Sequence, residues 1–275
     1  MGLKETTAEF MDLPGPEELW QLVDRWKRPG VPELLQDRSR AAGYTEFREL
    51  SLYLRERLEQ TRGIRLKKHL EKRVVDWLYN FIRLNVKRGR IFNLREVLVT
   101  GQADCLGYAK LFTVLARCCG LDAGVVEVII DNRGRAVPHT ASLATLADGC
   151  CQFIDFWYGS PDIRHRRLGL SVRQDHQWQV KDVNYKDLKS ARDIGFLPDR
   201  CVDAITLYIE GNRRLKDQDY PGAIERYSEA IRLYPQNARL FYNRAVAYES
   251  LGELQKAQAD YARALQDRAS IVRVL

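Results

Sequence analysis

The chain has 275 residues, 45% of them hydrophobic and 29% charged, and a formal net charge of +7. This is the composition of an ordinary globular protein that is long enough for two domains. No apolar stretch approaches the roughly 20 residues that span a bilayer, which excludes a membrane-spanning protein, and the start MGLKETTAEF lacks an apolar signal core. We therefore expect a cytoplasmic protein with no membrane contact.

The positive charge suggests a nucleic-acid partner, but the arrangement of the basic residues argues against one. Basic runs begin at Arg65 (RLKKHLEKR) and at Lys87 (KRGR) without any recognised binding motif, and Glu56, Glu59 and Glu71 interleave with the first run. Solvated helix faces explain such runs, and a basic rim that attracts acidic peptides is the sharper alternative. No nucleic-acid partner is expected.

The cysteines and histidines predict neither a disulfide framework nor a metal site. There are 6 cysteines, and the 4 histidines are scattered along the chain without zinc-ligand spacing. Cys118-Cys119 and Cys150-Cys151 are adjacent pairs, which rarely bridge each other, so they and Cys201 are interpreted as small buried thiols in a reducing compartment. We expect no metal and no other cofactor.

Residues 1–64 are predicted to be an N-terminal helical region with two helices, and a third helix is predicted just after it, at the start of the core. Apolar side chains recur at helical spacing in three segments, and the prolines and charges between the first two predict a connector at Pro29 to Gly43. The three segments are Pro16 to about Arg28, Thr45 to about Thr61, and about Leu66 to Val86. These helices are expected to form a layer that packs against the helix that follows.

The stretch from Gly101 to Gly159 carries the residues with chemical potential. Cys105 opens a helical pattern, with Asp104 as a good N-cap and Gly120 as a natural stop. A thiol in the first turn of a helix meets free backbone N–H groups and the positive end of the helix dipole. Both favour the thiolate, which is the form of cysteine that attacks carbonyl carbon.

Five strands are predicted after this helix, in an antiparallel sheet against which the helix packs. A short helix around Tyr185 to Arg192 and a linker at Gly195 to Arg200 are predicted to follow the strands. The predicted strands are Val125 to Ile130, one beginning near His139, one ending near Tyr158, Leu168 to Val172, and Trp178 to Val183.

Two registers are open for the hairpin that carries His139 and Asp155. A two-residue turn at Asp148-Gly149 would put these two side chains on opposite faces of the sheet. A three-residue loop that also includes Ala147, closed by glycine in the left-handed region, makes them diagonal neighbours on one face, with Ala141 leaving room between them. We predict the three-residue loop, which brings together a nucleophile, a base and an orienting carboxylate.

The order GQADCLGYAKLFTVLARCCGL, VPHTASL and DGCCQFIDFWYG resembles the core of the transglutaminase-like superfamily, whose papain-fold members carry a catalytic triad in these segments. The resemblance covers roughly residues 75 to 180 and implies Cys105 as nucleophile, His139 as base and Asp155 as orienter. It implies an α+β fold, with a papain-like core of helices packed on an antiparallel sheet at residues 65–196. Ala141 departs from the pattern, since the superfamily often has an aromatic residue two places after the histidine.

The remaining site residues follow from the same arrangement. The backbone N–H of Cys105 and the amide of Gln102 are candidates to hold an oxyanion. Trp157, with Tyr158 and Trp178, is a candidate to line a substrate cleft, although aromatic residues on sheets more often belong to the core. His165 and His176 lack a carboxylate at matching strand spacing and are weaker candidates for the base.

From Ala204 the chain repeats itself with a period of 34 residues. Ala204 matches Ala238, and Tyr227 matches Tyr261. The pattern resembles the tetratricopeptide repeat, which implies an all-α segment of two repeats at residues 204–270. Two repeats are fewer than the three or so that a free-standing solenoid needs, so the pair requires other cover. The small, aromatic and proline residues of the motif stand at Gly211, Ala223, Tyr227, Ala230 and Pro235.

Two classes of function follow from the sequence. The first is cysteine-dependent acyl transfer or hydrolysis of peptide or glutamine amide bonds in a protein or peptide substrate, with a leaning towards a protease- or deamidase-like hydrolase. The alternative is a non-catalytic interaction scaffold that uses the repeats. Asn212, Arg213 and Asn243 are the candidates to line a groove for a protein partner, and a purely structural appendage fits them equally well.

Overall fold

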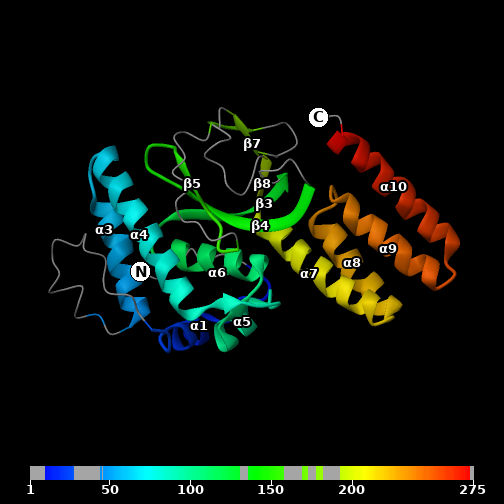
Figure 1. Cartoon of the computed structure of the whole chain (residues 1–275), viewed down its shortest axis with the longest axis horizontal. Coiled ribbons are helices and arrows are strands. Elements are labelled where there is room, and N and C mark those ends of the chain that lie inside the picture. Colours follow the sequence, from blue (N-terminus) through cyan, green and yellow to red (C-terminus); the bar gives the residue numbers. More distant parts are fainter. Residues whose placement is uncertain are drawn as a thin grey trace, which may run out of the picture. The chain divides into compact units, whose positions relative to one another are not determined.

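The computed structural model describes residues 10–27, 44, 46–130, 136–157, 169–172, 178–181 and 193–272. The chain divides into two compact units, Met1–Leu197 and Pro198–Leu275. In Figure 1 the first unit runs from blue to green and contains helices and strands, whereas the second runs from yellow to red and is all helix. The predicted fold class, an α+β core followed by an all-α segment, is confirmed.

Among the described residues, three helices open the first unit, and an aromatic cluster holds them together. They are α1 (Pro16–Val23), α3 (Phe47–Gln60) and α4 (Ile64–Asn85), which confirms the three predicted helices, although α1 ends sooner than predicted. Phe47 lies at the centre of the cluster, with ring-centroid distances of 6.1 Å to Trp20, 5.9 Å to Trp77 and 5.1 Å to Phe81. The predicted connector between α1 and α3 lies almost wholly outside the described residues.

Helix α6 (Cys105–Cys118) is the buried centre of the first unit. It packs on strands β3 (Asp122–Ile130) and β4 (Ala136–Thr145) and also contacts α4 and α5 (Leu94–Thr100). Its residues are buried on nearly all sides, which explains why its sequence is apolar beyond a single stripe. Figure 1 shows α6 running along one face of the sheet.

The main sheet has the strand order β5-β4-β3-β8, and every neighbouring pair is antiparallel. Strand β5 is Cys151–Ile154 and β8 is Asp193–Leu197. The predicted linker at Gly195 to Arg200 is therefore wrong, because its first part is an edge strand and α7 (Asp199–Lys216) begins just after it. Gly124 on β3 makes this pairing possible, since a Cβ there would lie 2.5 Å from the ring of Phe196.

The prediction that all five strands form one sheet is also wrong. Strands β6 (Gly169–Val172) and β7 (Trp178–Lys181) pair with each other in a separate two-stranded sheet. Strand pairing depends on which edges meet in space, and the local alternation of side chains does not specify that choice. The predicted short helix at Tyr185 to Arg192 lies outside the described residues.

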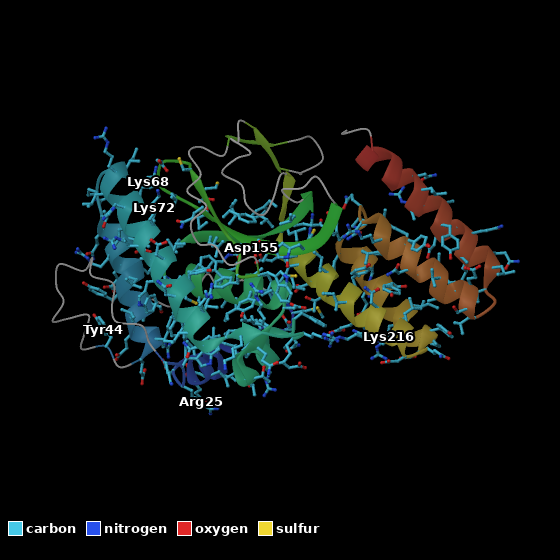
Figure 2. All side chains as sticks on the ribbon, in the orientation of Figure 1. Arg25, Tyr44, Lys68, Lys72, Asp155 and Lys216 are labelled. Atoms are coloured by element: carbon cyan, nitrogen blue, oxygen red, sulfur yellow. The ribbon has the colours of Figure 1, made fainter. Side chains whose placement is uncertain are left out.

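The hairpin between β4 and β5 has the predicted three-residue loop. Thr145 pairs with Cys151, and the backbone N–H of Leu146 donates to the carbonyl of Cys150 at 2.8 Å. Gly149 has φ of +76°, the left-handed conformation that closes such a loop. Helix α4 holds the loop from outside, because Lys68 forms an ion pair with Asp148 (Lys68 is labelled in Figure 2).

The described part of the second unit, up to residue 272, consists of four helices in two consecutive pairs. They are α7, α8 (Tyr220–Leu233), α9 (Ala238–Ser250) and α10 (Leu254–Val272). Tyr227 of α8 is fully buried against α7, where a Cβ at Gly211 would lie 2.5 Å from its ring. The small residue and the tyrosine thus fit each other as the repeat pattern predicts.

Candidate functional site

Cys105 is the first residue of α6, as the sequence predicts. Asp104 is the N-cap, and its Oδ1 accepts a hydrogen bond from the backbone N–H of Gly107 at 2.9 Å. Gly107 is required for the close approach of the preceding loop, since a Cβ there would lie 2.5 Å from the carbonyl oxygen of Ile91. The thiol is partly exposed at the positive end of the helix dipole.

His139 on β4 and Asp155 just after β5 are brought into direct contact. The distance between His139 Nε2 and Asp155 Oδ2 is 2.8 Å, and the two residues are 5% and 2% exposed. The other carboxylate oxygen, Oδ1, accepts a hydrogen bond from the backbone N–H of Trp157 at 2.8 Å. Both oxygens of Asp155 are engaged, so the carboxylate and the imidazole have a fixed orientation.

Cys105 and His139 interact, and each group shifts the pKa of the other. Burial raises the pKa of the Cys105 thiol, but the hydrogen bond and charge of His139, together with Thr140, outweigh it and hold this pKa below its ordinary value. Burial lowers the pKa of His139, but hydrogen bonds to Asp155 and Cys105 prevail and raise it to about 9. Both directions are those of a thiolate paired with an imidazolium.

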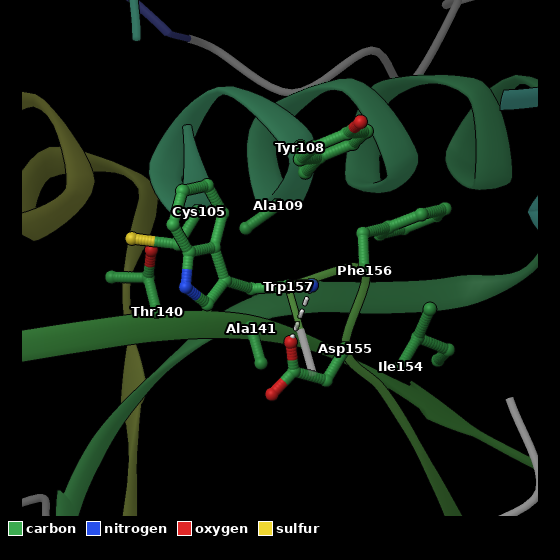
Figure 3. Close-up of a pocket in the computed structure, with 9 residues that line it drawn as sticks. All are labelled: Cys105, Tyr108, Ala109, Thr140, Ala141, Ile154, Asp155, Phe156 and Trp157. Carbon is green, nitrogen blue, oxygen red and sulfur yellow. Dashed lines mark hydrogen bonds between the residues drawn. The ribbon is translucent and has the colours of Figure 1, made fainter. Parts of the chain in front are cut away.

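A pocket opens beside the thiol between the start of α6 and strands β4 and β5 (Figure 3). Its walls are largely apolar, and the rings of Tyr108 and Phe156 stack at a centroid distance of 5.0 Å. The lining residues are Cys105, Tyr108, Ala109, Thr140, Ala141, Ile154, Asp155, Phe156 and Trp157. The predicted cleft residue Trp157 therefore lies in the pocket, and so does Ala141, at the position where the superfamily often has an aromatic residue.

Gln102 lies on β2 (Gln102–Ala103), which pairs in parallel with β1 (Lys87–Arg88). Its side chain is exposed and packs over Gly89, where a Cβ would lie 2.8 Å from the Cβ of Gln102. Gln102 is not among the residues that line the pocket. The structure thus places Gln102 three residues before the thiol but with its side chain over Gly89, just after β1.

The site also contains two residues that were not predicted from the sequence, Thr140 beside Cys105 and Arg88 beside Trp157. Thr140 is 7% exposed, and Figure 3 shows its hydroxyl beside the sulfur of Cys105. Thr140 lowers the pKa of that thiol, first through its backbone and then through its side chain. Arg88 lies over the ring of Trp157, with 5.4 Å between the guanidinium carbon and the ring centroid. Thr140 could have been found from the sequence, because it directly follows the predicted base His139. Nothing in the local sequence links Arg88 to Trp157.

In the second unit, two of the three predicted partner-binding residues meet. Asn243 of α9 donates a hydrogen bond from Nδ2 to Asn212 Oδ1 of α7 at 2.7 Å. The hydroxyl of Tyr227 donates to the same oxygen at 2.8 Å. Arg213 is exposed on α7 next to Asn212. The repeat pattern thus produces a polar cluster that joins three helices.

Comparisons with known proteins agree with these two halves. Residues 57–183 match the family model of the transglutaminase-like superfamily, and residues 211–252 match that of the tetratricopeptide repeat. The chain therefore contains a transglutaminase-like domain followed by tetratricopeptide repeats, which confirms both resemblances. Repeats of this kind support a role in binding other proteins.

Several curated proteins are similar to parts of the chain. Sperm-associated antigen 1 of Mus musculus is 34% identical over 76 residues, which are 25% of this chain and 8% of that protein. The Hsp70-Hsp90 organizing protein of Triticum aestivum is 40% identical over 57 residues, or 21% and 10% of the two chains. Stress-induced-phosphoprotein 1 of Caenorhabditis elegans is 35% identical over 159 residues, or 58% and 44%. The chain thus covers less than half of each relative.

Two further observations hold for the described ranges. None of their helices combines the length and apolar character needed to cross a lipid bilayer. Their His, Cys, Asp and Glu side chains form no group of three or more that could hold a metal ion.

Proposed function

We propose that the protein is a cysteine-dependent hydrolase or acyltransferase that acts on peptide or glutamine amide bonds. The observation that carries the proposal is the chain of contacts from Asp155 through His139 to Cys105. The match to the transglutaminase-like superfamily adds support, because it includes all three residues. We assign the chemistry to residues 65–196, with the helices of 1–64 as a supporting layer and 204–270 as the repeat segment.

The proposed reaction begins with the Cys105 thiolate. Its sulfur attacks the carbonyl carbon of the amide, and a carbon–sulfur bond forms as the carbon–nitrogen bond breaks. The imidazolium of His139 gives its proton to the departing amine, and Asp155 keeps the ring oriented. Water then attacks the thioester in hydrolysis, or a second amine attacks in transfer; His139 takes the proton of the attacking group, and the thiolate leaves.

The developing oxyanion requires hydrogen-bond donors near the thiol. The backbone N–H of Cys105 at the start of α6 is the first candidate. The amide of Gln102 remains the proposed second donor, after rotation of its side chain away from Gly89. Because the proposal needs a reduced Cys105, we expect the protein to act in the cytoplasm.

Selective alkylation tests the proposal. Iodoacetamide should label Cys105 rapidly at neutral pH, and His139→Ala should slow this labelling at least about tenfold, because the thiolate loses its partner. Peptide mapping by mass spectrometry separates Cys105 from the other five cysteines, of which Cys119 is fully buried and serves as an internal control. Slow labelling of Cys105 in both proteins would contradict the proposal and leave the interaction scaffold as the function.

We also propose that the repeat segment binds a protein partner. The cluster of Asn212 and Asn243, and the similarity to an Hsp70-Hsp90 organizing protein, support this proposal and suggest Hsp70 or Hsp90 as the partner. Isothermal titration of the full chain with purified Hsp70 and Hsp90 tests it. Asn243→Ala should weaken binding about tenfold or more, whereas Lys216→Ala, at an exposed position on α7 (Figure 2), should not change it. Absence of heat on titration with both chaperones would rule them out.

A further inference from the structure

Arg88 lies close to the segment that leads into α6, the helix that begins with Cys105. On the short parallel ladder of β1 and β2, its Cα pairs with that of Ala103, two residues before Cys105. The residue is exposed, so its guanidinium is available to a ligand that approaches from solvent. The ladder fixes its backbone, because the N–H of Lys87 donates to the carbonyl of Gly101 at 2.8 Å and that of Gly89 to the carbonyl of Ala103 at 2.8 Å.

The side chain of Arg88 is held against one wall of the pocket. Its guanidinium lies over the ring of Trp157, 5.4 Å from the ring centroid, and donates a hydrogen bond to the carbonyl of the same residue. Its charge also reaches Tyr108, since burial raises the pKa of that phenol and the charge of Arg88 acts in the opposite direction. Trp157 and Tyr108 both line the pocket beside Cys105, so the positive charge stands at this pocket.

This charge is not neutralised by the described part of the chain. Within it, the contacts of Arg88 are those with Trp157, and no carboxylate lies at ion-pair distance. Asp155, the acidic residue of the pocket, has its two oxygens engaged by His139 and by the backbone N–H of Trp157. A guanidinium has five N–H donors, and the carbonyl of Trp157 takes one. Against the described residues, Arg88 therefore keeps donors for a further acceptor.

We propose that Arg88 is a specificity-determining residue that binds a carboxylate of the acyl donor, next to the amide that Cys105 attacks. The preferred substrate is then a peptide with an acidic side chain beside the reacting bond. A guanidinium matches a carboxylate with two parallel hydrogen bonds, and stacking on an indole restricts its conformations before binding. This inference rests on the proposed function, because it assigns a substrate class to the same thiol.

Two alkylating reagents of nearly equal size test the inference. Iodoacetate carries a carboxylate and iodoacetamide a neutral amide, and the thiolate of Cys105 displaces iodide from either one to form a carbon–sulfur bond. The measured quantity is the ratio of the two labelling rates at Cys105, obtained by peptide mapping at low ionic strength. Arg88→Gln should lower the iodoacetate-to-iodoacetamide ratio about fivefold, the effect of losing one positive charge within several ångströms.

Matched variants separate the side chain from its surroundings. Lys87→Gln removes the same charge from the adjacent exposed position of β1, and it should change the ratio less than about twofold, since successive side chains of a strand point to opposite faces. Arg88→Lys keeps the charge and should retain most of the ratio. Added salt should lower the ratio in the unmodified protein, because it screens an exposed charge.

The outcomes distinguish this inference from the proposed function. A ratio that stays the same in Arg88→Gln, or that falls equally in Lys87→Gln, would overturn the role of Arg88. Slow labelling by both reagents at neutral pH would count against the proposed chemistry. In that case the ratio is measured at about pH 10, where thiols ionise without help, and it still decides the role of Arg88. Circular dichroism of each variant verifies its fold.

Discussion

The candidate sites of the two units differ in the burial and the charge of their polar side chains. In the first unit His139 and Asp155 are 5% and 2% exposed, and the pKa of His139 is raised to about 9. In the second unit the meeting side chains are the amides of Asn212 and Asn243, which are only half-buried. Buried charges respond to one another and can support proton transfer, whereas neutral amides can only give or accept hydrogen bonds.

The two units also differ in how far apart in the sequence their essential contacts lie. Tyr227 meets Gly211, a residue of the preceding helix in the same repeat. Lys110 of α6, in contrast, forms a buried ion pair with Asp12 from near the start of the described chain. The second unit is therefore built mainly from neighbours, and the first depends on distant segments. Five predictions test whether this difference between the units holds.

The largest effect is expected from Tyr227→Ala in the second unit. Tyr227 is fully buried, so truncation should lower the free energy of unfolding of this unit by about 3–5 kcal/mol through the cavity that it leaves. Urea titration followed by circular dichroism measures the loss. Tyr261 stands one repeat later and is partly exposed, so Tyr261→Ala should cost less than half as much. Equal losses of unfolding free energy in the two variants would contradict the expected dependence on the burial of each tyrosine.

A nearly equal effect is expected from Lys110→Met in the first unit. The side chain of Lys110 is 0% exposed, and its Nζ lies 2.5 Å from Asp12 Oδ2, which also accepts the backbone N–H of Leu94. Removing the ammonium leaves a buried carboxylate without its partner and should cost about 3 kcal/mol in thermal or urea unfolding. The double variant with Asp12→Asn should recover part of this loss. If the single variant unfolds like the unmodified protein, the first unit does not depend on this distant pair.

The third prediction concerns the proton on His139. Because its pKa is raised to about 9, NMR of the ring protons should show a midpoint well above 6.5, and Asp155→Asn should lower it. The folded form then gains stability from this proton fully below pH 6.5, and that gain is lost as the pH rises through about 9. Labelling of Cys105 at neutral pH should fall about tenfold in Asp155→Asn. An unchanged His139 midpoint in Asp155→Asn would contradict the coupling of charges that distinguishes this site from the second one.

The fourth prediction tests the loop that sets the register of the site. Gly149 has φ of +76° with nothing within 4 Å of the position of a Cβ, so Gly149→Ala should cost about 1 kcal/mol through backbone strain alone. Gly15 also has open space but φ of −56°, and Gly15→Ala should be nearly neutral. Thermal unfolding of the two variants provides the measurement. If Gly149→Ala leaves the thermal stability unchanged, the loop between β4 and β5 does not need the left-handed conformation at this position.

The smallest effect is expected from Thr140→Val. The hydroxyl of Thr140 lowers the pKa of Cys105, so its removal should raise that pKa and slow iodoacetamide labelling at neutral pH about threefold. The titration of His139 should stay nearly the same, because Asp155 holds that ring. The pH profile of labelling reports the shift directly. Faster labelling in Thr140→Val would exclude a stabilising role of the hydroxyl.

Local patterns of residues were enough to predict those features of the fold that depend on neighbours along the chain. Asp104 caps the helix that Cys105 opens, and the loop closed by Gly149 sets the register that puts His139 and Asp155 on one face. The period of 34 residues likewise specified the repeats. Caps, turns and periodic burial are local effects, so a pattern of residues is enough to predict them.

Contacts between distant segments could not be predicted from these patterns, because they form only in the folded chain. The tertiary structure placed β8 at the edge of the main sheet beside β3, and gave β6 and β7 a sheet of their own. It also brought Arg88 to Trp157, and Lys110 to Asp12, across 69 and 98 positions of the chain. Free strand edges and long charged side chains have many possible partners, and packing of the whole unit, rather than local pattern, selects among them.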